Sequence, residues 1–175
     1  MTKIIPKPEI GEYAPYTIMY IGLLPDDGQV LKYLEANLKA VKGIVYSLPE
    51  ERLAVPHAAG EWTVKEILCH IIDDERIYCY RALRFARNDM TELPGFDQED
   101  YINYSNSNRR NLEDIFEEYS AVRQATITFY KSLDDSAYVR MGISNGNMMS
   151  VRASAYHIAG HELHHINSIK DNYGL

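Results

Sequence analysis

Residues 63–88 have the sequence TVKEILCHIIDDERIYCYRALRFARN, which carries the clearest helix start in the chain. Thr63 and Glu66 have the spacing of a capping box, in which the threonine hydroxyl accepts a hydrogen bond from an orphan amide and the glutamate reaches back. Trp62 and Ile67 occupy the hydrophobic staple positions around this start. Apolar residues then recur at helical spacing, so the stretch predicts a long amphipathic helix.

Three further segments show the same helical spacing of apolar residues. These expected helices span residues 27–47, 109–132 and 150–172. Ser150 is suited to cap the last of them. A short helix is expected at 98–103, and the Asn145-Gly146 pair predicts a small hairpin before the last helix. Together the segments predict an all-α fold, a four-helix bundle.

The N-terminal segment, residues 1–25, contains four prolines. No helix can run through the whole of it, because proline lacks an amide donor and clashes with the preceding turn. We therefore expect an extended N-terminal arm over residues 1–25 that lies on a bundle domain formed by residues 26–175.

Composition and charge exclude several classes of protein. With 175 residues, 46% of them hydrophobic and 25% charged, the chain can form one globular domain with a sizeable core. A net charge of -7 argues against a nucleic-acid partner, because binding to phosphates requires clustered lysine and arginine. No apolar run approaches the ~20 residues that span a bilayer, so no membrane partner is expected.

The expected location is the cytoplasm, because the first residues lack the apolar core of a secretory signal. The cysteines agree with this location. Cys69 and Cys79 fall in one predicted helix, roughly 15 Å apart, which is too far for a disulfide and fits a reducing compartment.

The histidines are unevenly distributed. Five of the six lie on two predicted helices, and these are His70, His157, His161, His164 and His165. The last four fall within nine residues. Buried neutral imidazoles need partners and clustered cationic imidazoles repel one another, so the cluster indicates a metal site.

Helical geometry ranks the histidines of the last helix. At about 100° per residue, His161 and His165 lie one turn apart and border the apolar face. His157 and His164 are expected to lean toward solvent, although a ligand role for them stays open.

His70 borders the apolar face of its own helix in the same way. Asp74 lies one turn further along the same face, where its carboxylate could accept a hydrogen bond from the His70 ring and orient it. A solvated acid at the helix boundary is the alternative.

Two glutamates, Glu75 and Glu162, project into the apolar faces of their helices. A buried carboxylate is costly unless it is paired, hydrogen-bonded or near a metal. One of them could be bridged to Arg76, Arg81 or Arg152. Otherwise they are candidates for a general base or for additional metal ligands.

Residues 161–165 also match the H-E-x-x-H motif of zinc metalloproteases. The usual third ligand lies downstream, but only ten residues follow His165, so the third ligand must come from upstream and His70 is the candidate. A protease cleft also normally offers a strand edge, and no sheet of any size is expected. A di-iron bundle would share the spacing of Glu162 and His165 but requires a second E-x-x-H, which the sequence lacks. Both alternatives are therefore weaker.

Several stretches resemble the DinB/YfiT-like superfamily of metal-binding four-helix bundles. They are GEWTVKEILCH at 60–70, IIDDER at 71–76, FDQEDY at 96–101 and GHELHH at 160–165, and the resemblance covers most of the chain from about Glu50 onward. It implies a divalent metal ion, often nickel or zinc, held by three histidines that correspond to His70, His161 and His165. It also implies a homodimer. Members act as transferases or isomerases that use a low-molecular-weight thiol, or are described as metal-dependent hydrolases.

Three neutral imidazoles with an open coordination position suit a catalytic site. Our hypothesis is that the metal activates a thiol or water against a small electrophilic substrate. Glu162 or Glu75 would handle protons, and Tyr78, Arg81 and Tyr101 would line the substrate pocket. A non-catalytic bundle that keeps a metal for stability or sensing is the alternative, and an H-E-x-x-H metalloprotease is less favoured.

Overall fold

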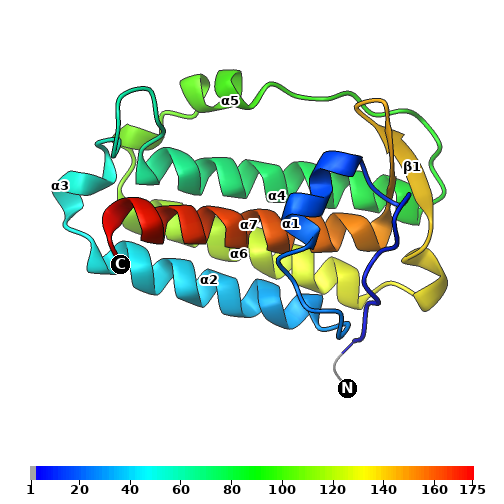
Figure 1. Ribbon diagram of the computed structural model, residues 1–175. Coiled ribbons are helices and arrows are strands. Elements are labelled where there is room, and N and C mark those ends of the chain that lie inside the picture. The colour runs from blue at the N-terminus through cyan, green and yellow to red at the C-terminus, as the bar shows by residue number, and fades with distance from the viewer. Residues whose placement is uncertain (1–2) are drawn as a thin grey trace.

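Four long helices pack side by side to form a bundle (Figure 1), as the apolar spacing predicts. The computed structural model describes residues 3–175. The long helices are α2 (Val30–Ser47), α4 (Val64–Ala86), α6 (Leu112–Lys131) and α7 (Val151–Tyr173). Around the bundle, α4 packs on α7, α7 on α2, α2 on α6 and α6 on α4. Within the described range, no helix is both long and apolar enough to cross a membrane.

Side-chain caps fix the starts of the two helices that carry the clustered histidines. The Thr63 hydroxyl accepts from the Glu66 amide at 3.1 Å, and the Glu66 carboxylate accepts from the Thr63 amide at 2.8 Å, which confirms the capping box of α4. The Ser150 hydroxyl accepts from the Ala153 amide at 3.0 Å and caps α7. These caps satisfy amides that would otherwise lack partners.

A hairpin leads directly into α7. Strands β1 (Met141–Ser144) and β2 (Asn147–Ser150) pair in antiparallel register. Between them Asn145 has φ 51° and Gly146 has φ 70°, the left-handed conformations that a two-residue type I′ turn requires. The predicted Asn-Gly hairpin is therefore confirmed.

Shorter elements connect the long helices. The predicted short helix is present as α5 (Gln98–Tyr104), which packs against α4. The sequence pattern did not predict α3 (Glu50–Leu53) or the 3-10 turns η2 (Ser107–Arg109) and η3 (Asp135–Ala137). These elements are too short to show a hydrophobic period.

The N-terminal arm differs from the extended segment that we expected. It contains a 3-10 turn, η1 (Pro15–Thr17), followed by a helical turn, α1 (Ile18–Ile21). Pro15 is the first residue of the turn, where its missing amide costs nothing, and the next proline is Pro25. The prolines therefore frame a short helix rather than exclude one. It packs on α7 (Figure 1).

The arm approaches α7 most closely at Gly160. A Cβ atom at this position would lie 2.3 Å from the carbonyl oxygen of Tyr20, so only glycine permits the contact. The side chain of Tyr20 lies in turn over the rings of His157 and His161, with centroid distances of 5.3 and 5.1 Å. The missing side chain thus allows the arm to cover the middle of α7.

We expect Gly160→Ala to destabilise the protein by about 1–3 kcal/mol, because the new methyl group forces the arm away from α7. Helix propensity alone predicts the opposite sign, a gain of about 1 kcal/mol. Gly43→Ala in α2 is the matched control, since a Cβ there meets nothing within 4 Å. Urea denaturation of both variants measures the effects, and equal stabilisation by the two substitutions would contradict the close approach.

The middle of the bundle is polar. Buried apolar residues form two clusters, one toward the hairpin and one toward α3. Six buried ionisable side chains of α4 and α7 fall where one cluster gives way to the other, and these are His70, Asp74, Glu75, His157, His161 and Glu162. A buried polar layer requires partners, so its contacts locate the candidate site.

Candidate metal centre

Three histidine side chains from α4 and α7 point at one another. His161 Nε2 lies 3.0 Å from His70 Nε2 and 3.1 Å from His165 Nε2. The three ligand atoms all lie within 4.8 Å of one another. His161 and His165 are one turn apart on α7, and His70 comes from the helix packed against it. Three imidazole nitrogens are thereby directed at one small volume.

This donor set fits a divalent metal ion. Burial lowers the pKa of His70 and His161 and lowers the pKa of His165 to about 3, so the rings are neutral at pH 7 and have lone pairs to donate. Around a tetrahedral ion with bonds of about 2.0–2.1 Å, ligand nitrogens lie about 3.3 Å apart. The observed separations are close to this value.

The Asp74 carboxylate lies beside the rings of His161 and His157. Its buried Oδ2 lies 3.3 Å from His161 Nδ1 and 3.3 Å from His157 Nε2, although neither contact has the alignment of a good hydrogen bond. A carboxylate beside Nδ1 favours the tautomer with the proton there, which leaves the Nε2 lone pair free for a metal. Asp74 thus faces His161 and His157 rather than the His70 ring that we expected, and its role in orienting a metal-binding histidine stays a prediction.

His157 is buried, contrary to the expectation that it leans toward solvent. Only 3% of it is exposed, and its ring stacks on Tyr78 at a centroid distance of 3.6 Å. The helical angle was correct, but α1 and Tyr20 cover this face of α7, and the α7 sequence alone carries no sign of that cover. His164 is half-buried, and its ring also packs against Tyr20.

Glu75 and Glu162 are fully buried and share a cation from α6. Arg123 Nη2 lies 2.9 Å from Glu75 Oε2 and 3.0 Å from Glu162 Oε2. The Tyr119 hydroxyl also donates to Glu162. Sequence reasoning offered Arg76, Arg81 or Arg152 as a possible partner, but these contact Glu118, the Pro94 carbonyl and Glu12 instead. Arg123 follows Tyr119 by one turn, so its inward position could have been read from the helical period.

The ion-pair cluster has a consequence for the two glutamates. Burial raises the pKa of Glu162 to about 7, an effect that the nearby Arg123 guanidinium opposes. Within residues 3–175, neither glutamate belongs to a group of side chains whose ligand atoms could hold a metal. Their role in proton transfer stays a prediction, while their contacts show a structural role.

Trp62 closes another side of the histidine group. Its ring lies 4.8 Å from the ring of His70, and its Nε1 donates to Glu99 Oε2 of α5 at 3.3 Å. Sequence reasoning gave Trp62 only a staple role and missed Glu99 and Tyr20. No pattern within a single helix marks such contacts between distant elements.

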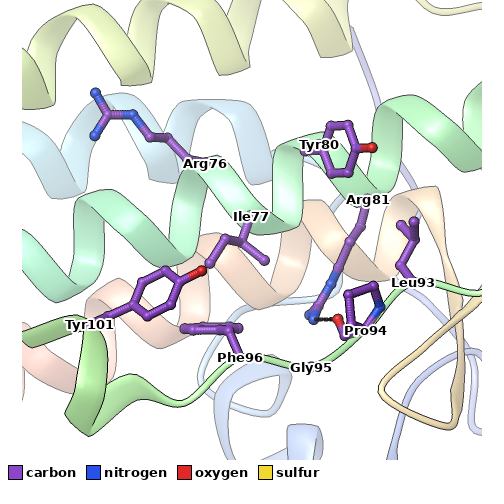
Figure 2. Close-up of a pocket in the computed structure, with 9 residues that line it drawn as sticks. All are labelled: Arg76, Ile77, Tyr80, Arg81, Leu93, Pro94, Gly95, Phe96 and Tyr101. Carbon is purple, nitrogen blue, oxygen red and sulfur yellow. Dashed lines mark hydrogen bonds between the residues drawn. The ribbon is translucent and has the colours of Figure 1, made fainter.

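The residues that we expected to bind substrate fall in two places. Arg81 and Tyr101 line one cavity of about 280 Å³ between α4 and the segment Leu93–Tyr101 (Figure 2). Tyr78 does not line it but lies under the Arg81 guanidinium, 4.9 Å from ring centroid to Cζ, and stacks on His157. The cavity and the histidine group are thus linked through Tyr78.

Fold and site together define a four-helix bundle in which two helices bring three histidines to one point. The sequence model of the DinB superfamily matches residues 33–169. The chain belongs to the DinB superfamily.

Two known proteins are similar to this chain. A protein of Oceanobacillus iheyensis named "Putative metal-dependent hydrolase" is 26% identical over 152 residues, which cover 84% of this chain and 85% of the relative. The structure of YfiT from Bacillus subtilis, described as "a probable metal-dependent hydrolase with an unusual four-helix bundle topology", superposes with a TM-score of 0.75. That match covers 94% of this chain and 95% of YfiT at 17% identity, so it shows a shared fold.

Proposed function

We propose that this protein is a metal-dependent hydrolase whose divalent ion, zinc or nickel, is held by His70, His161 and His165. The observation that carries the proposal is the convergence of three neutral imidazoles, in which His161 Nε2 lies 3.0 Å from His70 Nε2 and 3.1 Å from His165 Nε2, with all three ligand atoms within 4.8 Å of one another. The names of the two relatives agree with it.

A bound divalent ion would supply a Lewis acid that lowers the pKa of water or of a thiol and so provides a nucleophile near neutral pH. The protein's own contribution is positional. Asp74 favours the proton on His161 Nδ1, so that Nε2 keeps its lone pair. Tyr20 and Trp62 pack against the histidine rings and limit the access of water.

The proposal also concerns the identity of the nucleophile that the metal activates. A site with three protein ligands has room for one more, and either water or a low-molecular-weight thiol fits that position. The first makes the protein a hydrolase and the second a thiol transferase. A metalloprotease is disfavoured because, in the part of the chain that the structure describes, the sheet is a single hairpin of four-residue strands.

The test compares metal-free protein with protein reloaded with zinc or with nickel. Each form is assayed for hydrolysis of 4-nitrophenyl acetate and for conjugation of monochlorobimane with a set of low-molecular-weight thiols. We expect ester hydrolysis that is lost on chelation and restored by one of the two ions.

The outcomes separate the alternatives. Thiol conjugation without ester hydrolysis supports the transferase. If neither substrate turns over while chelation lowers the melting temperature, the ion is structural and the enzyme proposal fails.

A further inference from the structure

We propose that the cavity beside α4 binds a small organic carboxylate with an aromatic or apolar body, and that Arg81 is the residue that receives its carboxylate. Arg81 is only 5% exposed and lines the cavity (Figure 2). This inference concerns a ligand site and does not depend on metal-dependent hydrolysis.

Arg81 is a buried cation without an acidic partner. Within residues 3–175, no carboxylate oxygen lies within 4.0 Å of its guanidinium, and its one hydrogen bond goes to the Pro94 carbonyl oxygen at 3.0 Å. Arg123, the other buried arginine, is paired with both Glu75 and Glu162. An unpaired buried charge is costly, so the difference indicates a missing anion at Arg81.

The guanidinium is also held in place. Its Cζ lies 4.9 Å from the ring centroid of Tyr78 and 5.9 Å from that of Phe96. Such contacts attract the cation to the ring faces and fix the plane of its donors. A guanidinium has five N–H donors, of which the described contacts use one. The remaining donors suit the two oxygens of a carboxylate.

The cavity walls define the rest of the ligand. The lining is mostly apolar and aromatic, and it is supplied by Ile77, Tyr80, Leu93, Phe96 and Tyr101. A volume of about 280 Å³ is at the small end of ligand pockets, which suits one ring with a short chain.

The charge of the cavity favours a single negative group. Arg76, the second arginine of the lining, has its Nη1 3.6 Å from Asp73 and also pairs with Glu118, so its charge is already neutralised. Among the described residues that line the cavity, Arg81 is the cation left to bind an anion. A monoanionic carboxylate matches one free guanidinium, whereas a dianionic phosphate would need further cations.

The test titrates the full-length protein with 4-phenylbutyrate and with its uncharged analogue 4-phenylbutyramide, by isothermal titration calorimetry. We expect the acid to bind the wild type at least tenfold more tightly than the amide. Arg81→Gln should remove this preference, and Arg81→Lys should keep part of it because it keeps the charge but loses the fork of donors. Arg87→Gln is the matched control and should behave as the wild type, because Arg87 is an exposed arginine directly after α4 and outside the cavity.

NMR chemical-shift mapping on the wild-type protein tests the site without relying on a variant that could fail to fold. Amide shifts on adding 4-phenylbutyrate should concentrate at Ile77, Gly95 and Phe96. The proposal is overturned if acid and amide bind equally, if neither binds at millimolar concentration, or if the shifts lie elsewhere. It is also overturned if Arg81→Gln retains the preference, or if Arg87→Gln weakens binding as much.

Discussion

Arg123→Met is expected to lower the free energy of unfolding by about 3–5 kcal/mol. Arg123 is 2% exposed and is the cation shared by Glu75 and Glu162, which are both fully buried. Methionine fills similar space but leaves two carboxylates in the core without a counter-charge. Losing one partner of a buried cluster costs more than the cluster contributes, because the remaining charges stay desolvated. Urea denaturation followed by circular dichroism measures the loss.

Two further variants test whether charge, and not volume, causes this loss. Adding Glu75→Gln and Glu162→Gln to Arg123→Met should recover much of the stability, because no uncompensated charge remains. Arg76→Met removes a half-exposed arginine paired with Glu118 and should cost less than about 1 kcal/mol. If Arg123→Met costs no more than Arg76→Met, the buried cluster does not hold together as described.

Local signals were sufficient to predict most of the fold. The capping box at Thr63, the cap at Ser150 and the Asn145-Gly146 turn each act within a few residues, and the structure has all three. The apolar period predicted the four long helices because one stripe of each faces the core. The prediction of an extended N-terminal arm missed the short helix α1, because prolines restrict where a helix can start but do not forbid a short one.

The surroundings of the site could be predicted only in part. The helical angle of about 100° per residue placed His70, His161 and His165 at the edges of the apolar faces of their helices. The structure brings the ring nitrogens of these three histidines together. The helical angle could not show that α1 covers His157, nor which histidine Asp74 faces, because both depend on how helices distant in sequence pack.

His161→Ala is expected to abolish tight binding of zinc and nickel, whereas His164→Ala should leave binding almost unchanged. His161 Nε2 is the central nitrogen of the group, in contact with both His70 and His165. His164 directly precedes His165 on α7, but in the described chain it belongs to no group of side chains whose ligand atoms could hold a metal, so it is a matched control. Metal content and competition with a chromophoric chelator measure the affinities, and circular dichroism checks that both variants are folded. Full metal content in His161→Ala would remove the basis for the proposed centre.

Asp74→Asn separates a supporting carboxylate from a direct ligand. If Asp74 acts through His161 Nδ1, the variant still binds one ion, with an affinity about 10–100-fold lower, because an amide holds the ring less firmly than a carboxylate. This loss should be smaller than that of His161→Ala, which removes a donor outright. A loss as large as that of His161→Ala would instead make Asp74 a ligand, and the ion would then lie between Asp74, His157 and His161, whose ligand atoms also lie within 4.8 Å of one another. The ratio of the two affinity losses therefore decides on which side of the His161 ring the metal is held.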